Sequence, residues 1–166
     1  MCALKPTHLF QGERMVNMGR FSLVKNETQY KLSQETAEAA VQELIQFYGV
    51  DVDALPDRKQ QRAVEAAMSK LVDYYRMGLL ENIRDGSALK VKQHFANPPG
   101  DVREITYGQM SGKHKLASDG YDENDRYRRI YAILGSLAGL PDTAISALSG
   151  VDLAAAEDLG LVFLLG

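Results

Sequence analysis

Three histidines are the first residues of this 166-residue sequence that could carry metal or acid–base chemistry. His8, His94 and His114 lie far apart, and no pair has the HxH or HxxxH spacing that places two imidazoles on one metal ion. A zinc site needs three or four converging ligands, and the one cysteine, Cys2, supplies neither a thiolate set nor an intramolecular disulfide. We therefore expect no metal and no cofactor, and we interpret the histidines as ordinary surface or core residues.

Two groups of carboxylates could bind a cation or serve as an acid–base pair. Asp51 and Asp53 form the first group, and residues 119–125, with the sequence DGYDEND, form the second. The second group lacks the glycine at the sixth position and the glutamate at the twelfth that an EF-hand loop requires. We interpret it as a solvated acidic loop that caps the following helix.

Motifs for nucleotide binding or covalent catalysis are absent from the sequence. None of the patterns GxxxxGK[ST], GxGxxG, GxSxG and HExxH occurs, and Cys2 stands beside the initiator methionine. No nucleophile therefore has a recognisable base or phosphate-binding loop beside it. The sequence predicts a protein that is not an enzyme.

The densest basic group consists of Arg126, Arg128 and Arg129, which lie among tyrosines. Arginine with tyrosine could contact phosphates and bases of a nucleic acid. However, the carboxylates of the preceding loop oppose these charges, and the whole chain has 19 basic against 22 acidic residues, a formal net charge of −3. Proteins that bind nucleic acids through counterion release are usually basic. We favour an ordinary charged helix face, with a small nucleic-acid-binding regulator as an alternative.

Composition and apolar runs point to a protein without a membrane span. Apolar residues make up 45% and charged residues 25% of the chain, which is typical of a globular domain. The longest apolar runs, 130–140 and 159–165, are shorter than the roughly 20 residues that cross a bilayer. Residues 1–20 contain no long apolar segment of the secretory type. We expect a cytoplasmic protein that does not contact membranes.

The N-terminal half is predicted to contain a helical hairpin. Residues 1–20 are expected to form a flexible tail, and the region 21–78 a short strand followed by two helices. Apolar residues recur at helical spacing after Ser33, up to residue 48, and again after Asp57. Ser33 and Asp57 are residue types that cap helix N-termini, and a short loop between two such helices favours antiparallel packing.

The second half changes from strand to helix periodicity. Alternating residues around Asp85-Gly86 and the 97–101 turn predict a small antiparallel β-meander over 79–107. Residues 108–125 read as a polar connector, and 126–166 as a helical bundle whose last helix is capped by Asp152. The predicted fold class is therefore α+β and mainly helical, with an N-terminal helical hairpin, a small meander and a C-terminal helical bundle.

Residues 89–166 resemble the tail assembly chaperones of tailed bacteriophages. Members of that family have a β-hairpin, a charged linker, a helix ending in an (S/T)-G-L-P turn, a spaced I-x-x-L-x-x-x-D-L motif and a final helix. The matching residues here are the strand Val102–Tyr107, the turn Ala138-Gly139-Leu140-Pro141, and the spaced residues Ile145, Leu148, Asp152 and Leu153. The resemblance implies a non-catalytic chaperone in the cytoplasm of a bacterial host cell.

The partner that the resemblance implies is the tape-measure protein, a long helical client that such chaperones bind transiently during tail morphogenesis. Assembly of this chain into a homo-oligomer is a further possibility. Apolar side chains of the C-terminal helices would either contact the client or form the core, and sequence does not separate the two roles. A structural virion protein such as a head–tail connector is a further alternative. The candidate partner-binding residues are Tyr131, Leu134, Leu137, Leu140, Leu159 and Phe163.

Overall fold

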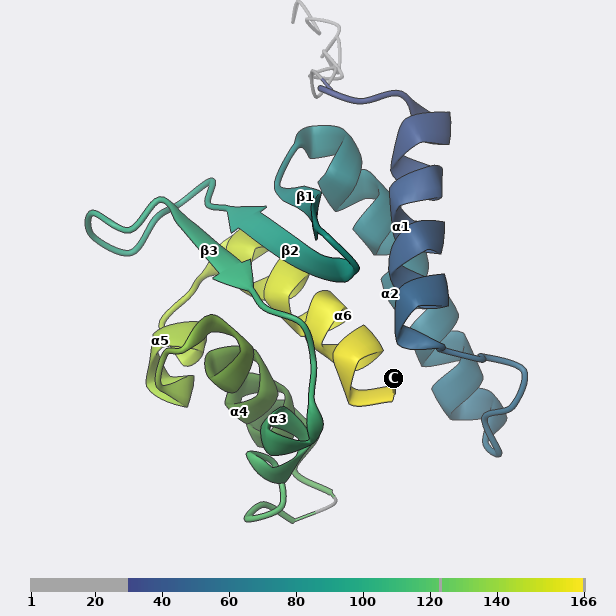
Figure 1. Ribbon diagram of the computed structural model, residues 1–166, viewed down its shortest axis with the longest axis vertical. Helices are drawn as coiled ribbons and strands as arrows, with labels where there is room; N and C mark the ends of the chain where they lie inside the picture. Colours follow the sequence, from purple (N-terminus) through teal and green to yellow (C-terminus); the bar gives the residue numbers. More distant parts are fainter. Residues whose placement is uncertain (1–29, 123, 166) are drawn as a thin grey trace, which may run out of the picture.

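The computed structural model describes residues 30–122 and 124–165 of the chain. Within these residues it contains six helices and one antiparallel sheet of three strands (Figure 1). The predicted α+β, mainly helical class is therefore confirmed. The tail expected over 1–20 and the strand expected over 21–25 lie outside the described residues.

Two long helices form the N-terminal hairpin, α1 (Gln34–Tyr48) and α2 (Arg58–Met77). Each begins where a side chain accepts a hydrogen bond from the first turn: Ser33 from the Thr36 amide and Asp57 from the Lys59 amide. These bonds satisfy N–H groups that have no partner within the helix. The two helices pack against each other, and α2 also packs along α6.

The sheet is a meander of β1 (Leu80–Asp85), β2 (Ala88–His94) and β3 (Glu104–Tyr107). Its order is β1-β2-β3, with Asn82 opposite Val91 and Gln93 opposite Ile105. Alternate residues of β2 and β3 are buried, as a sheet with one face on a core requires. The opposite face carries charged residues.

Four helices follow the sheet: α3 (Gly112–Leu116), α4 (Arg126–Ala138), α5 (Asp142–Ser146) and α6 (Gly150–Leu165). The polar connector thus includes one short helix. The prediction that Asp152 caps the last helix is wrong, because α6 begins two residues earlier, at Gly150. Its fully buried carboxylate instead accepts the amide hydrogens of Ala96 and Asn97, at 2.8 and 2.7 Å.

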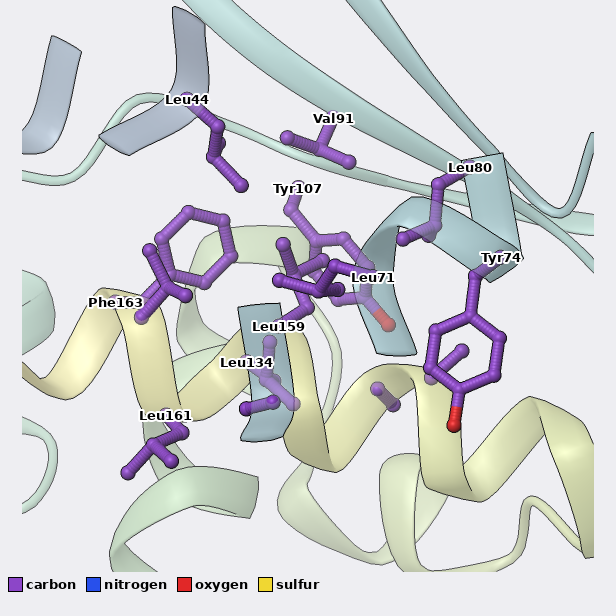
Figure 2. Packing of buried hydrophobic residues seen from close by; sticks show 14 of the residues in the cluster. Leu44, Leu71, Tyr74, Leu80, Val91, Tyr107, Leu134, Leu159, Leu161 and Phe163 are labelled. Atoms are coloured by element: carbon purple, nitrogen blue, oxygen red, sulfur yellow. The ribbon is translucent and has the colours of Figure 1, made fainter. Parts of the chain in front are cut away.

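Helix α6 lies at the centre of the molecule. It packs against α1, α2, α4 and α5, and apolar residues occupy its whole circumference, as expected for a helix enclosed by protein. Figure 2 shows Leu159, Leu161 and Phe163 of α6 with side chains from both helices of the hairpin, the sheet and α4 around them. Among the described residues, no helix is long and apolar enough to cross a membrane.

Candidate binding surfaces

Most of the predicted partner-binding residues are part of the core. Leu134 and Leu159 are 0% exposed, Phe163 is 1% exposed and Leu137 is 6% exposed. The Phe163 ring stacks edge-on against Tyr48 of α1, with 4.9 Å between ring centroids. These side chains therefore stabilise the folded chain and present no free surface to a partner.

Tyr131 is half-buried against the core, and Leu140 is exposed. The Tyr131 hydroxyl donates a hydrogen bond of 2.5 Å to Glu157 Oε1 on α6, and burial together with this bond raises the pKa of Tyr131 to about 12. Tyr131 thus joins α4 to α6 through a neutral phenol. Leu140 is 38% exposed and follows the end of α4. Among the four leucines of the predicted set, Leu140 is the one whose side chain is exposed to solvent.

Leu140 borders an apolar hollow of about 400 Å³ between the sheet and the α4–α5 turn, which we call the β3–α5 groove. Val102, at the edge of the groove, is 51% exposed. An exposed apolar concavity of this kind usually marks an interaction site. The apolar lining consists of Phe95, Pro99, Val102 and Ile105 on the sheet side and Ala138, Leu140 and Ala144 on the helix side.

Backbone contacts hold the two sides of the β3–α5 groove together. The Gly108 amide, just after β3, donates to the Leu137 carbonyl near the end of α4 at 2.9 Å. The chain then reverses at Gly139, whose φ of 67° is a left-handed conformation that glycine adopts without strain. The Leu140 amide donates back to the Gly135 carbonyl at 2.8 Å. This reversal fixes Leu140 opposite β3.

β3 is an edge strand of the sheet. In the described part of the chain its ladder partner is β2, on one side. Glu104, Ile105 and Thr106 of this strand line the groove. Among the described residues, the groove therefore combines apolar side chains with the edge strand of the sheet, a combination that suits binding of another polypeptide.

The arginines of α4 divide into two groups. Arg128 pairs with Asp125, with 3.2 Å between Nε and Oδ2, and Asp125 also caps α4. Arg126 and Arg129 instead border a second hollow, of about 160 Å³, which we call the α2–α6 groove. The structure therefore places two of the three predicted arginines at one site and the third outside it. The residues that line the α2–α6 groove are Gln60, Ala63, Val64, Arg126, Arg129, Leu161, Leu164 and Leu165.

The two described histidines have different surroundings. His94 lies on the open face of the sheet between Glu81 and Glu104, with 3.3 Å from a ring nitrogen to each carboxylate. His114 is buried at the start of α3, where Nδ1 accepts a hydrogen bond from the Ser111 amide. Each contact stabilises local structure. His8 and Cys2 lie outside the described residues.

The acidic groups also have local partners. Asp51 accepts hydrogen bonds from the amides of Asp53 and Ala54, and Asp122 accepts one from Asn124. Across residues 30–122 and 124–165, no three histidine, cysteine or acidic side chains are positioned to bind a metal ion. The acidic loop therefore caps and turns the backbone.

Sequence reasoning missed the sheet side of the β3–α5 groove. Phe95 and Val102 lie just outside the strands, on the two sides of the 97–101 turn, and this position of two apolar residues beside a turn is the signal in the sequence that could have singled them out. No protein-family model, curated protein or solved structure shows significant similarity to this chain.

Proposed function

We propose that this protein is a non-catalytic tail assembly chaperone of a bacteriophage or prophage, which transiently binds a helical segment of the tape-measure protein in the β3–α5 groove. It acts in the cytoplasm of the bacterial host. The groove shields apolar side chains of the client until the tail tube forms around it.

The observation that supports the proposal is which segments of the chain form the β3–α5 groove. The strand Val102–Tyr107 and the turn Ala138–Pro141 are two of the three segments that carry the resemblance to tail assembly chaperones; in the third, Ile145, Leu148 and Asp152 are buried. The strand and the turn are more than 30 residues apart in the chain, yet they form opposite sides of one apolar groove. A shared sequence pattern that only supported the core would have no reason to leave Val102 and Leu140 exposed.

A groove of about 400 Å³ suits a small contact with the client. Burial of apolar area contributes roughly 25 cal/mol per Å², from which the cost of ordering the client is subtracted. Interfaces that bury less than about 1,200 Å² in total are typical of weak, short-lived complexes. A chaperone that must release its client needs an interface of this kind.

The test is co-expression with each of the proteins encoded beside the gene, followed by affinity capture through an N-terminal tag; the expected client is a long, helix-rich protein. The wild-type protein is expected to keep the client soluble and to be captured with it. Val102→Asp and Leu140→Asp place a charge in the groove at exposed positions and are expected to abolish capture without lowering the melting temperature. Leu159→Asp is unsuitable, because Leu159 is fully buried and its substitution tests folding.

Leu116→Asp is the matched control, since Leu116 is 67% exposed and lies on α3, away from the groove lining. Capture that Leu116→Asp reduces as strongly as Leu140→Asp would contradict the proposal. So would assembly of the protein into rings that remain in purified virions, which is the behaviour of a head–tail connector.

A further inference from the structure

The α2–α6 groove is a second surface with its own chemistry, and it shares no residue with the β3–α5 groove. Its apolar part comes from the end of α6 and from Ala63 and Val64 of α2. Leu164 and Leu165 are half-buried there. A volume of about 160 Å³ is close to that of engineered cavities that hold a benzene molecule, about 150 Å³, so one aliphatic or aromatic side chain fits.

Two guanidinium groups, those of Arg126 and Arg129, border this apolar surface. In the part of the chain that the structure describes, neither Arg126 nor Arg129 forms an ion pair, whereas Arg128 between them pairs with Asp125. Arg129 is half-buried and so has lost part of its hydration. A carboxylate would restore those interactions through short, charge-assisted hydrogen bonds.

The surrounding charge is mainly positive. The first two turns of α2 carry Arg58, Lys59 and Arg62, none of which forms an ion pair among residues 30–122 and 124–165. The nearby carboxylates Asp57 and Asp125 already accept hydrogen bonds at the starts of α2 and α4. Glu65, one turn further along α2, is exposed. An acidic ligand would therefore be attracted to this end of the molecule.

We propose that the α2–α6 groove binds an acidic amphipathic helix of a partner protein. One apolar side chain of that helix inserts against Leu161 and Leu164, and flanking glutamate or aspartate side chains pair with Arg126 and Arg129. The apolar lining favours a polypeptide over a nucleic acid, whose phosphates would leave these leucines uncovered. This proposal does not depend on the tail assembly function.

The first experiment measures binding of a fluorescent 18-residue helical peptide built from leucine and glutamate, with leucine at i, i+4 spacing. The purification tag of the protein is added at its N-terminus, so that no residues are added next to the groove-lining Leu165. Because charge-assisted hydrogen bonds are stronger than neutral ones, Arg126→Gln with Arg129→Gln is expected to weaken binding at least tenfold. Arg128→Gln, the matched control, is expected to change the dissociation constant less than twofold.

Two further measurements separate the apolar and charged contributions. Ala63→Phe fills the groove without changing its charge and is expected to reduce peptide binding at least about tenfold, as loss of a well-buried contact does. Substitution of lysine for every glutamate of the peptide is expected to abolish binding. Circular dichroism and melting temperature establish that each variant is folded.

Three results would overturn the proposal. The first is no measurable binding of the leucine–glutamate peptide by the folded wild-type protein. The second is an equal loss of affinity for Arg128→Gln and for the double variant, which would indicate attraction to net charge alone. The third is tighter binding of a single-stranded DNA oligonucleotide that Ala63→Phe leaves unchanged, which would assign the arginines to a nucleic acid.

Discussion

His114 illustrates how one buried side chain makes the fold sensitive to pH. Its Nδ1 accepts the Ser111 amide hydrogen at 3.0 Å, which requires an unprotonated nitrogen. Burial, followed by the charge of Lys113, lowers the pKa of His114 from the ordinary value of 6.5. The neutral imidazole is therefore the form that the folded protein favours.

We expect the free energy of unfolding to decrease as the pH falls below about 6.5, the ordinary pKa of histidine. In this range the unfolded chain binds a proton that folded His114 does not, so acid favours unfolding until folded His114 is protonated as well. The measurement is urea unfolding between pH 5 and 8. His114→Asn keeps an acceptor for Ser111 and is expected to lose this pH-dependent step.

A His94→Asn variant is the control, because His94 lies on the open sheet face. It is expected to retain the step that His114→Asn removes. An unchanged pH profile for His114→Asn would show that other groups dominate the titration.

Gln93 shows which residue-scale features the sequence could predict. The alternation of residues along the strand places it on the same face as Leu89 and Val91, and all three side chains are buried. Its partners were not predictable, because the amide donates to the Asp152 carbonyl at 2.6 Å and accepts from the Tyr107 hydroxyl at 2.8 Å. These partners lie 59 and 14 residues away. A local sequence pattern indicates on which face of a strand a side chain lies, but not which distant group forms its hydrogen bonds.

At the scale of elements, the α4–α5 turn depends on Gly135. A Cβ atom at this position would lie 2.8 Å from the Leu140 carbonyl oxygen and 3.1 Å from the Asp142 nitrogen. Both are backbone atoms of the reversed chain, so they do not move aside as a flexible side chain would. The close approach holds the helix side of the β3–α5 groove against α4.

Gly135→Ala is expected to destabilise the protein by about 1–3 kcal/mol, the usual cost of forcing extra volume into a packed site. It is also expected to displace Leu140 and so weaken client capture more than the stability loss alone explains. Urea unfolding and the capture assay measure the two effects. Gly112→Ala is the control, because a Cβ atom there contacts nothing within 4 Å. Equal behaviour of the two variants would contradict this role for Gly135.

Element boundaries were easier to predict than element environments. Ser33 and Asp57 begin α1 and α2 through hydrogen bonds with amides two or three residues ahead, so their residue types were sufficient to predict these helix starts. The apolar end of the chain was harder, because a helix that is apolar on all sides is equally compatible with a buried core and an exposed interface. Helix α6 is buried because it packs against α1, α2, α4 and α5, and the residue pattern of α6 alone does not indicate these neighbours.

At the scale of the whole molecule, one hydrophobic cluster connects the N-terminal hairpin, the sheet and the C-terminal helices. Leu159→Ala is expected to lower the free energy of unfolding by about 3 kcal/mol, as is typical for a leucine in a core. Because the core is shared, amide hydrogen exchange in α1 and α2 is expected to accelerate as much as in α4 and α6.

Leu116→Ala is the control, since Leu116 is largely exposed and is expected to leave exchange unchanged. Normal protection of α1 and α2 in the Leu159→Ala variant would indicate that the hairpin folds independently.

The central position of α6 has a consequence for synthesis. A ribosome makes this helix after every other described element, and the core cannot close before it has left the exit tunnel. Until then the nascent hairpin, sheet and α4 expose the apolar faces that later enclose Leu159 and Phe163. Folding of the shared core is therefore completed only after α6 has been made, and the newly made chain must be protected from aggregation during that interval.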